Sequence, residues 1–207
     1  MTWHPEILGR RQKRVLAQIG PMLSRRGFYL VGGTALALYL GHRRSVDFDW
    51  FTPEPFDPAG LAEELRAQGI AFGTDGVAPG TLHGLVGGIR VSLLRHAYPR
   101  LAALRTLRGG IRIAARADLA AMKLLAIAQR GAKKDFVDIY ALGKRSGSLR
   151  PMLRSYQKKF ATEDIAHLLC SLAYFVDADA DRLPTMLWDV KWRTVKETIQ
   201  RWVRSIP

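Results

Sequence analysis

A short apolar run, Phe28 to Val31, ends at Gly32-Gly33 and leads directly into a compact apolar segment, Thr34 to Leu40. Such a run is typical of a buried strand, and a glycine pair lets the chain turn sharply after it. The next segment has the length of a short helix, and Gly41 is placed to cap it. A strand, a glycine turn and a helix in immediate succession predict a mixed α/β core.

The expected secondary structure of the rest of the chain changes near residue 112, from mixed helices and strands to helices alone. The first part predicts helices over 6–26, interruptible at Gly20-Pro21, and 59–68, and strands over 46–51, 70–72, 81–86 and 89–94. The Gly87-Gly88 pair suits a hairpin turn between the last two strands. The second part predicts helices over 116–129, 133–144, 149–158, 162–175 and 185–204. We therefore expect an α+β fold, with a mixed sheet and flanking helices in residues 1–112 and a helical bundle in residues 113–207.

The charge of the chain is strongly unbalanced, with 32 Lys and Arg against 18 Asp and Glu and a formal net charge of +14. This balance favours a polyanionic partner, and nucleic acid is the usual one. No stretch approaches the roughly 18 unbroken apolar residues of a membrane-spanning helix. The polar N-terminus has no apolar signal core, so we expect a cytoplasmic protein with no membrane partner. Cys170, the single cysteine, is expected to pack inside a helix.

Two acidic residues, Asp47 and Asp49, follow the glycine turn within a predicted strand. Side chains two apart on a strand project from the same face, so the two carboxylates would stand together while Val46, Phe48 and Trp50 pack behind them. Neighbouring carboxylates repel each other unless a cation lies between them, and a hard divalent ion resolves that conflict. The glycine turn precedes a helix N-terminus, which favours phosphate. Together they describe a nucleoside-triphosphate (NTP) site with a bridging metal ion.

Four segments in this order give the chain a resemblance to the AbiEii/AbiGii toxin-like nucleotidyltransferases, within the polymerase-β-like superfamily. They are Gly32-Gly33-Thr34-Ala35-Leu36, Arg44-Ser45-Val46-Asp47-Phe48-Asp49-Trp50, Asp118-Leu119-Ala120-Ala121-Met122-Lys123 and Lys134-Asp135-Phe136-Val137-Asp138-Ile139-Tyr140. The resemblance spans residues 28 to 142. It implies transfer of a nucleoside monophosphate from an NTP to a hydroxyl with Mg²⁺ (or Mn²⁺). It also implies a toxin of a toxin–antitoxin or phage-defence pair, with a cognate antitoxin.

The resemblance also implies roles for single residues. Asp47 and Asp49 would bind the metal, Lys123 would meet the phosphates, and Asp135 would be an acidic partner or general base. Nucleotide binding would fall to Gly32, Gly33, Thr34, Arg44 and Ser45, with Lys123. Independently of any family, Lys123 lies in an apolar helix, so its ammonium must reach water or a negative partner. Asp138 follows Lys134 by four residues, which suits a surface ion pair.

One departure from the superfamily pattern concerns a third carboxylate, which many such enzymes bring from a later strand. The corresponding strand here, residues 88–94, contains no acid, and Ser92 stands where the acid is expected. Three outcomes stay open: Asp135 supplies the base, the metal binds weakly, or catalysis is lost.

The acceptor is expected to be an RNA of tRNA-like size, because neutralised phosphates give affinity without sequence preference. Three alternatives remain: an inactive nucleotide- or RNA-binding member of the fold, a transferase that places AMP or UMP on protein, and a plain basic RNA-binding or structural module. Arg43 and Arg44 could reach the triphosphate or the acceptor backbone, and His42 is the one histidine near the carboxylates. A stripe near the C-terminus suits a core or dimer contact, or else a base-stacking platform: Trp188, Trp192, Val195, Ile199, Trp202 and Val203.

Overall fold

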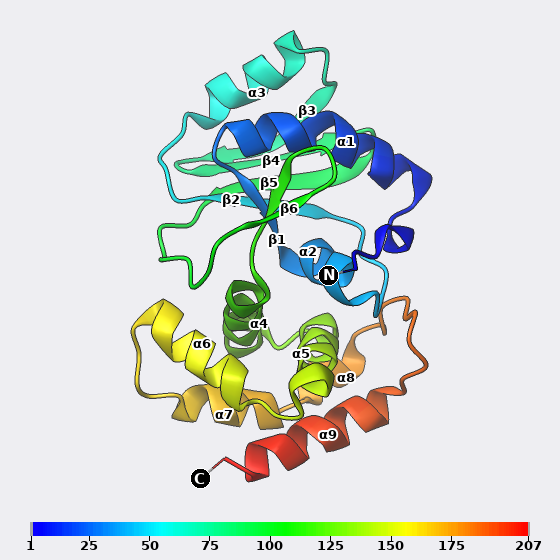
Figure 1. The fold of residues 1–207 in the computed structure, drawn as a ribbon, viewed down its shortest axis with the longest axis vertical. Helices are drawn as coiled ribbons and strands as arrows, with labels where there is room; N and C mark the ends of the chain where they lie inside the picture. Colours follow the sequence, from blue (N-terminus) through cyan, green and yellow to red (C-terminus); the bar gives the residue numbers. More distant parts are fainter. Residues whose placement is uncertain (1, 207) are drawn as a thin grey trace.

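The computed structural model describes residues 2–206 and contains one mixed sheet of seven strands, ordered β3-β4-β5-β2-β1-β7-β6 (Figure 1). Strand β2 runs antiparallel to β1 and parallel to β5, whereas β3, β4 and β5 form an antiparallel meander. The strand bounds are β1 Tyr29–Val31, β2 Phe48–Thr52, β3 Phe72–Ala78, β4 Thr81–Val86, β5 Ile89–Arg95, β6 Arg105–Leu107 and β7 Ile111–Ile113. The predicted α+β class is confirmed.

Helices cover the sheet and fill the second half of the chain. In Figure 1, α1 and α3 lie on the upper side of the sheet, and α4 to α9 form a separate layer below it. Their bounds are α1 Arg10–Arg25, α2 Gly32–Leu40, α3 Pro58–Ala67, α4 Arg116–Arg130, α5 Lys133–Ser146, α6 Arg150–Phe160, α7 Ala166–Ala173, α8 Val176–Ala180 and α9 Trp192–Arg204, with a short 3-10 helix at Pro5–Ile7. In residues 2–206, no helix is long and apolar enough to cross a bilayer.

One face of β2 packs in the core, and the other face carries Asp49. Phe48 and Trp50 are fully buried, whereas the alternate residues Asp49 and Phe51 are only partly buried. Since side chains alternate along a strand, one face of β2 supplies the core and the other faces a more open region. Helix α2 packs against β1, β2 and α4. The sheet therefore holds Asp49 on the face that meets the helical layer.

Several predicted elements differ from the observed ones. Helix α1 continues through Pro21, and Gly20 packs so closely on Ile111 that an added Cβ would lie 2.8 Å from its side chain. The glycine therefore serves close packing on β7 rather than a break. Strands β6 and β7 were not predicted, because three residues carry too little periodicity; β7 gains its place by pairing in parallel with β1.

The C-terminal predictions are partly corrected. Helices α7 and α9 are shorter than the predicted 162–175 and 185–204, and Trp188 lies outside the last helix. Val195, Ile199 and Trp202 are buried, so the stripe on α9 packs in the core. Cys170 is exposed, against the expectation of a packed cysteine, because it falls on the outer side of α7.

Candidate active site

The glycine turn faces Asp49 directly. Val31 and Asp49 are paired across the antiparallel β1–β2 ladder, and α2 begins at the next residue, Gly32. Gly32 has φ +69°, and a Cβ there would overlap the Asp49 Oδ2. Both observations require glycine at this position. The glycine turn and the Asp49 carboxylate are therefore adjacent, as predicted.

Asp47 lies on the loop before β2 rather than on the strand. Strand β2 begins at Phe48, and Val46 is 67% exposed instead of packing behind the carboxylates. The loop does not extend the strand because its backbone is bonded elsewhere. Arg44 N–H donates to Thr185 O, and Leu187 N–H donates to His42 O. A segment from before α9 therefore holds the loop that carries Asp47.

Further bonds fix this loop from the other side. The Thr34 hydroxyl is buried and donates to the Asp47 carbonyl oxygen at 2.5 Å. Gln12 Nε2 donates to the Ser45 carbonyl oxygen at 2.6 Å. Thr34 thus ties the start of α2 to the main chain of Asp47, which leaves its hydroxyl engaged with the protein.

The Asp49 carboxylate is poorly solvated and poorly compensated. Burial raises the pKa of Asp49, and the negative Asp47 adds to the rise, while Lys123 opposes it. Asp47 therefore lies close enough to act on the charge of Asp49, and two such carboxylates are oxygen donors that fit a hard divalent cation such as Mg²⁺. Mg²⁺ characteristically takes one or two carboxylates and completes its shell with water and substrate phosphate.

Lys123 lies behind Asp49 and is held by two acids of α5. Its Nζ is 2.8 Å from Asp135 Oδ1 and 2.6 Å from Asp138 Oδ2, and the side chain is almost fully buried. Burial alone would lower the pKa of Lys123, but Asp138 and Asp135 outweigh it and raise that pKa. The ammonium therefore has the negative partners that its apolar helix required.

Asp135 is itself engaged on both oxygens. Arg130 donates to it from Nε at 2.9 Å and from a terminal nitrogen at 3.2 Å, in addition to Lys123. Although burial favours the neutral acid, these cations hold the pKa of Asp135 below its usual value. A saturated, acidic carboxylate accepts a proton poorly. Of the two predicted roles for Asp135, these contacts favour that of an acidic partner, which anchors Lys123 and Arg130, over that of general base.

Asp138 is fully buried instead of forming the expected surface pair with Lys134. Arg43 grips it with Nε at 2.7 Å and a terminal nitrogen at 2.8 Å, and His42 Nε2 lies 2.7 Å from the same carboxylate. Burial lowers the pKa of His42, so the ring is neutral. Arg43 therefore does not extend toward a ligand, and it links the Asp47 loop to α5.

The absence of a side chain at Gly33 leaves the room that the Arg43 side chain occupies. A Cβ at Gly33 would lie 2.5 Å from the Arg43 guanidinium and 3.2 Å from Ser45 Oγ. Glycine is thus needed so that Arg43 can reach Asp138, whereas Arg44 is exposed. The resemblance assigned Arg44 to nucleotide binding, whereas Arg43, one residue earlier, is the arginine that is buried and bonded to Asp138.

A cleft of about 240 Å³ opens between this face of the sheet and α4. Three cations, Arg43, Lys123 and Arg130, share the two carboxylates of α5, and two of them, Lys123 and Arg130, line the cleft beside Asp49. The cleft thus combines apolar walls with a cationic wall and a carboxylate, which suits an anionic ligand that brings a metal ion. Its lining is Val31, Gly32, Asp49, Phe51, Leu94, Leu119, Met122, Lys123, Ala126 and Arg130.

Ser92 stands beside Asp49 on the adjacent strand. The parallel β2–β5 ladder pairs Asp49 with Ser92 in register, and Ser92 is buried. This is the neighbouring-strand position at which the third carboxylate was expected. The structure therefore places a hydroxyl there.

Comparisons with known proteins agree with this architecture. The chain is 35% identical over 206 residues to an uncharacterized protein of Aquifex aeolicus, covering 96% of this chain and 97% of that one. A candidate nucleotidyltransferase from H. pylori has a similar fold, with a TM-score of 0.59, 16% identity and 95% of each chain covered. The nucleotidyltransferase toxin MenT4 of Mycobacterium tuberculosis gives a TM-score of 0.56 at 16% identity, covering 94% of this chain and 83% of that one.

The family assignment comes from the sequence itself. Residues 14–102 and 108–201 match the family described as nucleotidyl transferase AbiEii toxin, type IV TA system. The match includes the glycine turn, Asp47, the cleft residue Asp49, and the two helices that carry Lys123, Asp135 and Asp138. This chain is a nucleotidyltransferase and belongs to the AbiEii family of toxins of type IV toxin–antitoxin systems.

Proposed function

We propose that the protein transfers a nucleoside monophosphate from an NTP to a hydroxyl of an RNA acceptor, in a reaction that requires Mg²⁺ or Mn²⁺. The observation that carries this proposal is the Gly32 bend pressed against Asp49 at a cleft with a cationic wall. A Gly-bounded helix N-terminus, the Asp49 carboxylate and two cations at one cleft, with Asp47 on the adjoining loop, are the parts that phosphoryl transfer needs. Release of pyrophosphate accompanies the transfer.

Each group has a distinct task in this proposal. Mg²⁺ held by Asp47 and Asp49 would polarise the α-phosphate and stabilise the leaving pyrophosphate. Lys123 and Arg130 neutralise the phosphates from the α4 wall, and Asp135 fixes both cations in place. The N-terminus of α2 at Gly32 and Gly33 receives the terminal phosphates, with Ser45 and Arg44 at its margin. Asp138 and Arg43 keep the Asp47 loop in position.

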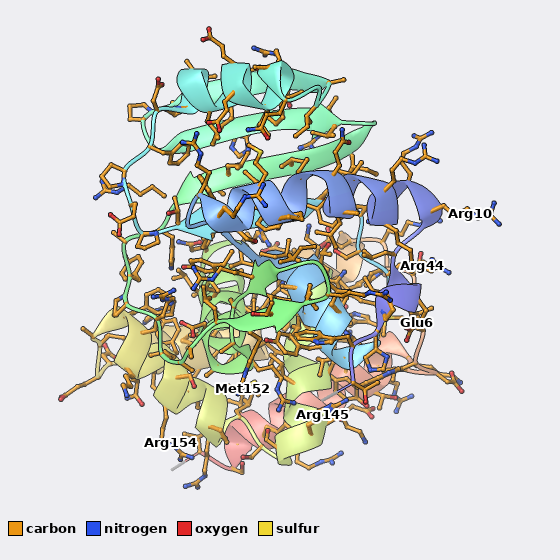
Figure 2. All side chains as sticks on the ribbon, turned by 45° about the horizontal axis from the view of Figure 1, so that its top comes forward. Glu6, Arg10, Arg44, Arg145, Met152 and Arg154 are labelled. Atoms are coloured by element: carbon orange, nitrogen blue, oxygen red, sulfur yellow. The ribbon has the colours of Figure 1, made fainter. Side chains whose placement is uncertain are left out.

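The RNA acceptor is supported by the surface charge. Arg10, Arg44, Arg145 and Arg154 extend outward from different sides of the molecule (Figure 2). Two lysines are buried and do not contribute to this surface: Lys159 pairs with Asp118 at 2.8 Å, and Lys133 bonds to the main chain of Asp179 and Asp181. The remaining cations still far outnumber the acids, which favours a polyanion. The cytoplasm, where NTPs and tRNA occur together, is the expected place of the reaction, and a cognate antitoxin the expected partner.

Binding to total tRNA should weaken steeply with salt. For six neutralised phosphates, affinity falls about 10³-fold between about 50 and 200 mM salt, because bound counterions are released on binding. Fluorescence anisotropy with labelled tRNA at several salt concentrations measures the slope. Arg154→Ala should reduce the slope by about one, whereas Glu54→Ala, which removes an exposed acid, should not reduce it. A flat salt dependence would contradict an electrostatic RNA surface.

The reaction is tested by incubating the protein with each α-labelled NTP, Mg²⁺, and either total tRNA or total cell protein. Label on RNA that requires Asp49 supports the proposal. Label on protein identifies an AMP- or UMP-transferase instead. Nucleotide binding without label on either acceptor identifies an inactive member of the fold. EDTA should abolish the signal, and added Mg²⁺ or Mn²⁺ should restore it.

A further inference from the structure

Ser92 is paired with a histidine that the sequence did not single out. His83 on β4 is in register with Ser92 on β5, and His83 Nδ1 lies 3.1 Å from Ser92 Oγ. The β4–β5 hairpin brings together two residues nine positions apart. Ser92 is buried and His83 is partly buried, so the contact is shielded from bulk water on one side only.

The pair continues a row that crosses the active site. Val31 pairs with Asp49, Asp49 with Ser92, and Ser92 with His83, so one row runs across β1, β2, β5 and β4. Residues in register on neighbouring strands lie on the same face, about 4.8 Å apart from strand to strand. Ser92 therefore neighbours Asp49, and His83 lies one strand further from the cleft wall formed by α4.

Asp49 has different neighbours on its two sides, helix α4 on one and the β4–β5 hairpin on the other. The α4 side carries Lys123 and Arg130, which the proposed function assigns to the triphosphate. The hairpin side carries Ser92, His83 and the exposed Arg90, which lies two residues before Ser92 on the same face of β5. The acceptor hydroxyl must approach the α-phosphate opposite the leaving pyrophosphate, hence from the hairpin side.

We propose that Ser92 and His83 together take the place of the third carboxylate, with Ser92 Oγ contacting the acceptor hydroxyl and His83 receiving the proton through it. The inference rests on the proposed function. Asp135 is an unsuitable acceptor because both of its oxygens are engaged by cations. His83 Nδ1, by contrast, lies within hydrogen-bond distance of Ser92 Oγ, and histidine is the side chain that most often serves as a general base.

The step uses the neutral form of His83 that carries its proton on Nε2, so that Nδ1 can accept a second proton. The acceptor oxygen forms a bond to the α-phosphorus, and the bond from that phosphorus to the bridging oxygen of pyrophosphate breaks. The acceptor proton passes to Ser92 Oγ while the proton of Ser92 passes to His83 Nδ1. The imidazolium then returns its proton to water.

The charged surroundings of the ring are few. β4 itself has no charged residue. The charged groups on elements packed against β4, or on the same row, are Arg90 and Arg95 on β5, Asp75 on β3, Asp49 on β2, and Glu63, Glu64 and Arg66 on α3. Arg66 is bonded to Thr74 and to the Phe72 carbonyl oxygen, so it does not engage the ring.

The test is a double-mutant cycle that measures kcat for nucleotide transfer and NTP affinity. His83→Asn should lower kcat about 10²-fold, the low end for a general base, and leave the NTP dissociation constant unchanged. Ser92→Asp restores a carboxylate at the expected position, so His83→Asn in that background should cost little. A purely structural His83 would cost the same in both backgrounds. His167→Asn, a histidine of α7 that contacts Tyr156, is the matched control and should not change kcat.

Equal losses of kcat in the wild-type and Ser92→Asp backgrounds overturn the Ser92–His83 inference alone. If the wild-type chain transfers no nucleotide to any acceptor, the proposed function fails and the inference fails with it.

Discussion

Replacing Asp49 with asparagine should lower nucleotide transfer by about 10³-fold or more while stabilising the fold. The loss corresponds to about 4 kcal/mol of transition-state stabilisation, the scale of removing a metal ligand's charge. The stabilisation follows from the environment of Asp49, whose charged form is disfavoured by burial and by Asp47. An amide of the same shape keeps the fit against Gly32 without that charge. Transfer assays and thermal unfolding at pH 7 measure the two effects.

The sign of the pH dependence makes this prediction specific. Because the pKa of Asp49 is raised in the folded state, the folded state holds its proton more tightly than the unfolded state. The wild type therefore loses stability as pH rises from the unfolded value, about 3.9, through the higher folded value. Asp49→Asn should lack this loss, so the difference in stability between the variant and the wild type should increase with rising pH.

Metal binding supplies the control that separates the two effects. Mg²⁺ should raise the melting temperature of the wild type, since a ligand that binds only the folded state stabilises it, and should have a much smaller effect on Asp49→Asn. Glu54→Gln, an acid-to-amide change at an exposed position, should behave as wild type. Full activity in Asp49→Asn would exclude this carboxylate from the chemistry.

The sequence predicted the parts of the site that are local in the chain. The strand, glycine turn and helix from Phe28 to Leu40, and the carboxylate at Asp49, follow from patterns of a few residues. The β4–β5 hairpin follows equally from its glycine pair. Neighbouring residues carry these signals, so no knowledge of tertiary contacts is needed.

The missed features depend on contacts between distant segments. The sequence did not show that Arg43 and His42 are bonded to Asp138, because that carboxylate lies 95 and 96 residues further along the chain. Val46 looked like a core residue because the strand pattern gives no sign that residues 185–187 would bond to the adjacent backbone. Tertiary hydrogen bonds decide such positions, and periodicity does not record them.

Because it joins segments that are far apart in the sequence, Asp138 is the acidic residue whose replacement should reduce stability most. Its carboxylate accepts from Arg43, lies against His42 and pairs with Lys123, and all four side chains are buried. It therefore joins the end of α2, the Asp47 loop, α4 and α5 through one charge. Removing one partner of a buried charged group leaves the other charges uncompensated, which costs more than the pair itself contributed.

Asp138→Asn should thus reduce the free energy of unfolding by about 3–5 kcal/mol, measured by urea denaturation at pH 7. Asp138→Glu retains the charge and should lose less, and Asp189→Asn, at an exposed position, should lose almost nothing. The pKa of Asp138 is held well below its usual value by Lys123 and Arg43 despite burial. Its stabilisation is therefore complete above the unfolded pKa and disappears as pH falls through the folded one.

The difference between wild type and Asp138→Asn should consequently stay constant above about pH 5 and narrow progressively below about pH 4. A loss smaller than about 1 kcal/mol, typical of exposed ion pairs, would contradict a buried network at this place. Because Arg43 reaches Asp138 only past Gly33, Gly33→Ala should reproduce part of the same loss. The glycine of the turn and the acid of α5 then act on one structure, the loop that holds Asp47 beside Asp49.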